Sequence, residues 1–149
     1  MPRNPSNLHD HDYRAQAANF AKLPFGIVDA HSHVNGARAS ALLREAMDLY
    51  GIGEIWSMTA LEQVPAVREV LGDRLKLIAV PDFASKDRRH AHGPGYLERI
   101  ERYHALGARI CKFWAAPRIT DFAIELGDPG MFRLDAPARL EAMGLAERL

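Results

Sequence analysis

Apolar and polar positions follow two alternating spacings from residue 25 onward. Short apolar runs of strand length are each followed by a segment whose apolar residues recur at three- and four-residue intervals, which is typical of an amphipathic helix. The predicted strands cover residues 25–34, 54–59, 75–80 and 108–114, and the predicted helices cover 39–50, 61–71, 96–106 and 135–149. The chain therefore repeats a strand–helix unit four times.

The helix ends carry recognisable signals. Leu42, Leu43, Met47 and Tyr50 have helical spacing, and Gly51 follows them as a stop. Glycines also follow the second and third helices. The last helix is expected to begin near Asp135, with the aspartate as N-cap and a proline in its first turn. The segment between residues 115 and 134 has no clear period and is expected to be irregular.

Repeated strand–helix units predict parallel strands joined by helical crossovers, in an open sheet or a closed barrel. An open sheet usually places a glycine-rich phosphate loop after its first strand, whereas a barrel places catalytic residues at the carboxyl ends of its strands. Here His-Ser-His-Val-Asn-Gly follows the first apolar run, without a G-x-G-x-x-G motif. We predict an α/β fold: the first half of a (β/α)8 TIM barrel, with four parallel strands in sequence order.

The chain is too short for a complete barrel, and its sequence divides into two parts. A complete barrel needs about 250 residues, and this chain has 149. Residues 1–24 are polar, with a weakly helical stretch at 13–22, and form an N-terminal leader segment in this interpretation. Residues 25–149 form an incomplete barrel that stops before a fifth strand. An exposed sheet edge would remain, so the chain is either part of a longer protein or pairs with a second copy.

Candidate chemistry lies at the end of the first predicted strand. His31 and His33 are spaced by one residue, so they share one face of a strand, and Asp29 is expected on that face too. Neutral imidazole is a common ligand of zinc-like ions. A carboxylate beside the imidazole, such as Asp29, often orients it. The alternative is a pair of hydrogen-bonded loop histidines.

The spacing alone is weak evidence, because seven histidines in this length give roughly 0.3 His-x-His pairs by chance. The chain has three such pairs: His9/His11, His31/His33 and His90/His92. The first lies in a polar N-terminal stretch, and the third lies in a segment predicted to be a loop. Only the middle pair closes an apolar run and precedes turn residues, so we assign a metal site to it alone.

The fourth predicted strand contains a second candidate. Lys112 alternates with Ile110 and Trp114, so the three share a face. If that face lines the barrel interior, the Lys112 amine points toward the histidines and serves as a base or a substrate anchor. The alternative is a solvated or ion-paired lysine.

Other residues have structural explanations. Thr59 and Asp82 end the second and third strands, and each is expected to be a turn or helix-entry residue rather than part of the site. Trp56 and Trp114 are expected to pack in the barrel wall. Cys111 is expected to face away from Lys112 as a small core residue.

Composition excludes several classes of function. The 19 basic and 19 acidic residues balance, so no basic surface recruits nucleic acid or a membrane. No apolar run approaches the roughly 20 residues of a membrane span, and the polar N-terminus lacks the apolar core of a secretory signal. One cysteine cannot form an internal disulfide and fits a reducing cytoplasm.

The segment Ile-Val-Asp-Ala-His31-Ser-His33-Val, followed by repeated strand–helix units, resembles the amidohydrolase superfamily of metal-dependent barrels. The resemblance is greatest to the amidohydrolase-related branch, which also contains decarboxylases. It implies that His31 and His33 bind the metal. It also implies a role for Lys112, which in carboxylated form could bridge two metals. The family's further histidines and its catalytic aspartate belong to strands that this chain lacks.

Together these patterns predict a metal-dependent hydrolase that uses zinc or a similar ion. It would act on a C–N or C–O bond of a small molecule through metal-activated water. The chain alone is expected to be catalytically incomplete, because two histidines are fewer than the three protein ligands of a catalytic zinc. Two alternatives stay open: a non-oxidative decarboxylase with the same ligands, and a non-catalytic barrel piece that serves in assembly.

Overall fold

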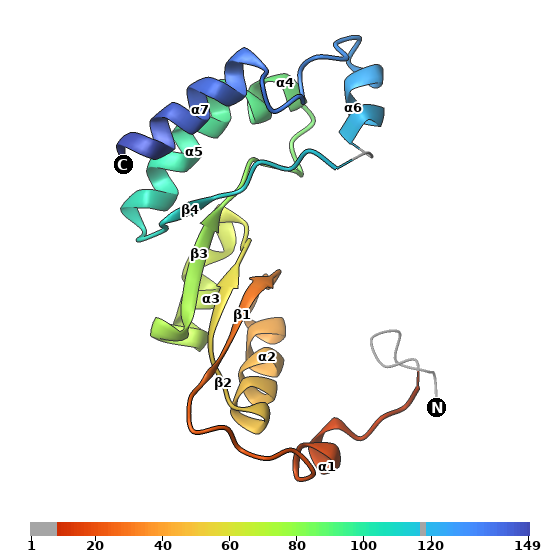
Figure 1. Ribbon diagram of the computed structural model, residues 1–149, viewed down its shortest axis with the longest axis vertical. Helices are drawn as coiled ribbons and strands as arrows, with labels where there is room; N and C mark the ends of the chain where they lie inside the picture. The colour runs from red at the N-terminus through yellow and green to blue at the C-terminus, as the bar shows by residue number, and fades with distance from the viewer. Residues whose placement is uncertain (1–8, 117–118) are drawn as a thin grey trace.

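A computed structural model describes residues 9–116 and 119–149 of the chain. Its sheet has four parallel strands in the order β1-β2-β3-β4 (Figure 1). The strands are β1 (Ile27–Ser32), β2 (Ile52–Ser57), β3 (Leu75–Ala79) and β4 (Ile110–Cys111). The sheet is curled and matches half of a (β/α)8 barrel, which confirms the predicted fold class.

Helices connect the strands and cover one face of the sheet. The crossovers contain α2 (Ala37–Tyr50), α3 (Val64–Leu71) and the pair α4 (Arg88–His92) and α5 (Pro94–Ala105), and α6 (Ile119–Glu125) and α7 (Pro137–Arg148) follow β4. Short 3-10 turns, η1 (Leu61–Gln63) and η2 (Gly72–Arg74), flank α3. As predicted, α2 ends at Gly51, whose φ of 71° is the left-handed conformation that glycine adopts without strain.

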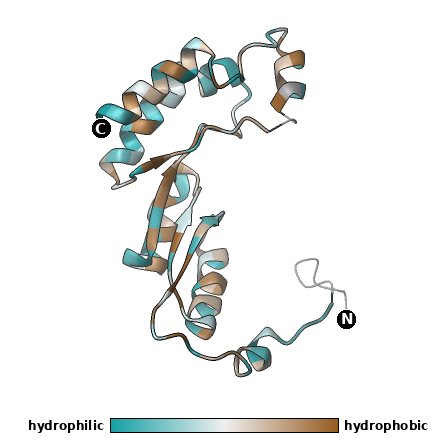
Figure 2. Cartoon of the chain, in the orientation of Figure 1, coloured by the Kyte–Doolittle hydropathy of each residue, from teal (hydrophilic) through white to brown (hydrophobic). Residues whose placement is uncertain are grey.

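The core lies between the sheet and these helices. Ile55 of β2 and Leu77 of β3 are fully or almost fully buried, and they pack with α3 and α5 side chains in one apolar cluster. Ser57 of β2 is a buried polar residue. Figure 2 shows apolar stretches along the strands. A second, smaller cluster joins α6 to the chain before α7; its buried members are Ile119, Ala123 and Phe132.

The opposite face of the sheet is open. Val28 of β1 pairs with Glu54, and Ile110 of β4 pairs with the buried Ile78. Val28 is 53% exposed and Ile110 is 42% exposed. The open part of this face therefore lies at the two outer strands. Parallel sheets are normally covered on both faces. The open face therefore corresponds to the interior of a closed barrel.

The fourth strand is shorter than the predicted 108–114. Lys112 N–H still donates to the Ala79 carbonyl (2.9 Å). The carbonyls of Lys112 and Trp114, however, accept hydrogen bonds from side chains and not from a neighbouring strand. Tyr96 Oη donates to the Lys112 carbonyl (2.9 Å), and Arg139 Nη2 donates to the Trp114 carbonyl (2.8 Å). These bonds draw the chain out of the sheet after Cys111.

Three further predictions were wrong in detail. The 88–94 segment, predicted to be a loop, contains α4, because Asp87 caps it by accepting from His90 N–H (3.0 Å). The segment predicted to be irregular contains α6. Asp135 does not cap α7, because its carboxylate pairs with Arg133 (2.8 Å) instead, and Ala136 stands at the N-cap.

The N-terminal segment contacts the barrel half through one short helix. In α1 (Tyr13–Ala17), Arg14 forms an ion pair with Glu45 of α2, and Tyr50 Oη donates to the Tyr13 carbonyl (2.8 Å). In the part of the chain that is described, no helix has both the length and the apolar character needed to cross a membrane.

Candidate functional site

The two candidate histidines lie together at the carboxyl end of β1. His31 is the penultimate residue of the strand, and His33 follows its last residue. Their ring centroids are 5.5 Å apart, with the planes tilted by 53°. Both side chains are exposed. This is the same-side arrangement that period-two geometry predicts.

A β-bulge sets the direction of the pair. Between the pairs Asp29–Ile55 and Ser32–Ser57, β1 advances by three residues while β2 advances by two. Because Ser32 pairs with the buried Ser57, the residues on either side of Ser32 belong to the open face. The extra residue breaks the alternation that predicted Asp29 on the histidines' face. Asp29 Oδ1 accepts a hydrogen bond from the His31 backbone N–H (3.1 Å).

Lys112 approaches this pair from the opposite edge of the sheet, just after β4. Its Nζ lies 3.3 Å from His31 Nε2. In a flat sheet β1 and β4 would be about 14 Å apart, since each strand adds almost 5 Å. The curl of the sheet and the length of both side chains bring the two nitrogens into contact. The predicted convergence of Lys112 with the histidines is thus present in the geometry.

The electrostatics favour a neutral imidazole at His33. Partial burial lowers the pKa of His33 below its ordinary value, and the positive charges of His31 and Lys112 lower it further. A neutral imidazole has a free lone pair for a metal ion. The site is therefore suited to bind a cation through His33 once the charge of Lys112 is turned away or neutralised.

Hydrogen bonds from β2 hold the loop that carries His33. Met58 N–H donates to the Ser32 carbonyl (2.9 Å), and Val34 N–H donates to Ser57 Oγ (3.2 Å). Asn35 Oδ1 accepts from Ala60 N–H (2.8 Å). The turn residue Asn35 was visible in the sequence, whereas the role of Ser57 was missed, because a serine inside an apolar strand has no sequence signature of its own.

Asp82 has the turn role predicted for it, whereas Thr59 is a buried residue between β2 and η1 and is neither a turn residue nor a helix N-cap. Thr59 is fully buried, its hydroxyl donates to Ser57 Oγ (3.0 Å), and its carbonyl accepts from Tyr103 Oη (2.7 Å). Asp82 Oδ1 accepts from the Ala84 N–H (3.0 Å) in the turn after β3. These contacts fix the carboxyl ends of β2 and β3.

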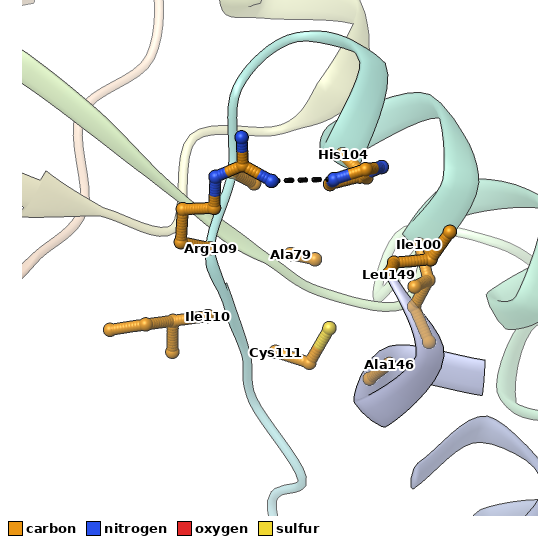
Figure 3. A pocket seen from close by; sticks show the side chains of 9 residues that line it. Ala79, Ile100, His104, Arg109, Ile110, Cys111, Ala146 and Leu149 are labelled. Atoms are coloured by element: carbon orange, nitrogen blue, oxygen red, sulfur yellow. Dashed lines mark hydrogen bonds between the residues drawn. The ribbon is translucent and has the colours of Figure 1, made fainter. Parts of the chain in front are cut away.

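Cys111 lies on the helix side, away from the histidines. It lines a cavity of about 90 Å³ between β4, α5 and α7, where its sulfur lies among Ile100, Ala146 and Leu149 (Figure 3). Burial raises the pKa of the Cys111 thiol. Arg109 and His104 form a 2.6 Å hydrogen bond at the cavity rim. The thiol is thus a small core residue, as predicted.

At the end of β1, the described residues supply two imidazoles and no third metal ligand. Within residues 9–116 and 119–149, no group of three or more His, Cys, Asp or Glu side chains is placed to hold one metal ion. His31 and His33 therefore fit part of a metal site rather than a complete one.

No protein-family model, no curated protein and no solved structure matches this chain.

Proposed function

We propose that His31 and His33 bind a divalent metal ion, with zinc as the best candidate, as part of the site of a metal-dependent hydrolase. The substrate would be a small molecule with a hydrolysable C–N or C–O bond. The observation that carries the proposal is the pair of imidazoles, 5.5 Å apart between centroids, at the carboxyl end of a parallel strand. That end of a β/α barrel is where catalytic residues lie.

Two ligands are fewer than a catalytic zinc site needs. Such sites usually have three protein ligands and an open position for water. A bound zinc ion would lower the pKa of that water and polarise a substrate carbonyl. Because the described residues provide only His31 and His33, we assign no catalytic step to the ion in this chain alone. We expect weak metal binding and no turnover until further ligands are added.

Lys112 has a defined role in this proposal. Its ammonium donates to the lone pair of His31 Nε2 (3.3 Å) when the ring is neutral. A metal ion at Nε2 would replace this hydrogen bond, and the amine would then be free to bind an anionic or carbonyl oxygen of the substrate. The resemblance to amidohydrolases suggests a second possibility, in which carboxylated Lys112 becomes a ligand itself.

A non-catalytic role in assembly is a second candidate, and the open face supports it. β1 and β4 are the outer strands, and Val28 and Ile110 on the open face are exposed. An uncovered parallel sheet with unpaired edges favours association. Two copies related by a two-fold axis along the strands would pair β4 of each with β1 of the other, and so close an eight-stranded barrel.

The test compares this chain with a longer chain that adds later strands. Metal content after dialysis and hydrolysis of a small amide and lactone panel are measured for both. We expect tight metal binding and turnover only in the longer chain, and we expect His31→Ala or His33→Ala to abolish both there. Stoichiometric metal and turnover by the 149-residue monomer would contradict the claim that it holds half of a site. Release of CO2 from a carboxylic acid panel instead would assign the decarboxylase.

A further inference from the structure

Arg139 of α7 is a buried cation with an unused donor. Only 5% of the residue is exposed, and its Nη2 donates to the Trp114 carbonyl (2.8 Å). Its Nη1 is buried and has no hydrogen-bond partner among residues 9–116 and 119–149. Among the described residues, no carboxylate forms an ion pair with it. The guanidinium lies over the Phe132 ring, 5.8 Å from the ring centroid. A buried charge that lacks a counter-ion is destabilising, so a bound anion would stabilise this guanidinium.

The surroundings of Arg139 add positive charge. The guanidinium lines a cavity of about 10 Å³ whose wall also includes Lys112 and His92. The positive charges of Arg139 and Arg88 both act on the His92 ring, opposed there by the carboxylate of Asp82. Asp82 uses its Oδ1 to accept from the Ala84 N–H. Among the described residues, Arg139 and Lys112 are the charged residues of the cavity wall, and no carboxylate lines it.

The cavity wall selects for a compact ligand. Its volume is close to the lower limit for one water-sized occupant. Apart from Pro81, aromatic residues form the rest of the wall. Phe83 and Trp114 meet edge to face at 80°, and Phe83 meets His92 edge to face at 65°. Aromatic edges carry partial positive charge and tolerate an anion. Chloride or one carboxylate oxygen would fit with a small outward shift of these rings, and a bulky anion would not fit.

We propose that Arg139 Nη1 and this aromatic cavity form a binding site for one compact anion, of the size of chloride or of a carboxylate oxygen. The site lies beside Lys112. Its guanidinium comes from α7, and the site does not depend on the metal. Binding would neutralise the buried guanidinium and fix α7 against the chain after β4.

The test measures the melting temperature of the full chain in sodium chloride, sodium formate and sodium gluconate at equal ionic strength. Gluconate is too bulky for the cavity. We expect chloride or formate at ten times its Kd to raise the melting temperature by about 5 °C over gluconate. Arg139→Met should lose this difference, and Arg148→Met, an exposed arginine at the end of the same helix, should keep it. A larger rise in formate would identify a carboxylate as the preferred occupant.

Bromide supplies a readout that needs no variant. Crystals of the wild-type chain soaked in bromide should show an anomalous peak within hydrogen-bond distance of Arg139 Nη1. Equal melting temperatures in all three salts, together with no bromide peak at Nη1, would overturn the proposal and leave the cavity to a water molecule.

Discussion

The pairs His31/His33 and His90/His92 have the same spacing in the sequence and opposite surroundings in the fold. At the end of β1 both rings are exposed and lie together, 5.5 Å between centroids. On α4 the pair is split: His90 is exposed, whereas His92 is 7% exposed and packs edge to face against Phe132, 4.9 Å between centroids. A helix turns by about 200° over two residues, and a strand by about 360°.

A histidine spacing therefore has meaning only together with the helix or strand that carries it. On a strand, one intervening residue brings two imidazoles to one side, as a metal needs. On a helix, the same spacing sends one ring into the core and the other into solvent. We therefore expect the first pair to matter for ligand binding and the second pair for stability.

The largest expected effect is the pH dependence that His92 gives to stability. Burial, followed by the charges of Arg139 and Arg88, lowers the pKa of His92 to about 4. An unfolded histidine titrates near 6.5, so between the two values the unfolded chain binds more protons. The stability contribution is complete above about pH 6.5 and is lost as the pH falls toward about 4, by about 3 kcal/mol in total.

Denaturant unfolding from pH 7.5 to 4 measures this effect. His92→Phe keeps the ring and removes the titrating group, so the difference between the wild-type and variant curves isolates His92 from the carboxylates. A difference that stays constant with pH would show that His92 is not held neutral in the fold.

Truncation should separate the two members of the α4 pair. His92→Ala removes a packed ring between Phe83 and Phe132 and should cost about 2–3 kcal/mol of unfolding free energy. The exposed His90→Ala should cost less than about 0.5 kcal/mol. His31→Ala, at an exposed site, should resemble His90→Ala. Equal losses at the two α4 positions would contradict the split arrangement.

A smaller effect is expected from Lys112 at the strand-end pair. Lys112→Met removes a positive charge and a competing hydrogen bond at His31 Nε2. Zinc affinity of the chain should rise about five-fold, which corresponds to about 1 kcal/mol of charge repulsion at short range. Lys86→Met, an exposed lysine in a turn, is the control. A loss of affinity in Lys112→Met would instead identify Lys112 as a ligand.

The strand order was predictable because it follows from the regular repetition of the chain. Each apolar run formed a strand, and α2 ended at the predicted glycine. The segments after residue 80 were harder, because tertiary contacts decide them. Tyr96 and Arg139 bind the carbonyls of Lys112 and Trp114, just after β4. The carboxylate of Asp135 pairs with Arg133 and does not cap α7. No local sequence pattern predicts these side-chain contacts.

The candidate site was predictable in part. The sequence indicated that His31 and His33 share a side and that Lys112 faces them. It misplaced Asp29, because a β-bulge has no reliable signature in a short apolar run. It also missed Arg139 and its cavity, since an arginine on a helix is normally solvated, and burial depends on neighbours contributed by α4 and by the chain after β4.

The central claim is that His31 and His33 bind a metal together. A zinc titration followed by imidazole ¹H–¹⁵N NMR tests it most directly, with His9→Ala/His11→Ala as the control, because that pair has the same spacing outside the sheet. We predict that zinc shifts the imidazole nitrogens of His31 and His33 at the same metal-to-protein ratio, in the wild-type chain and in the control. A response confined to other histidines, or one that persists unchanged in His31→Ala/His33→Ala, would contradict the account.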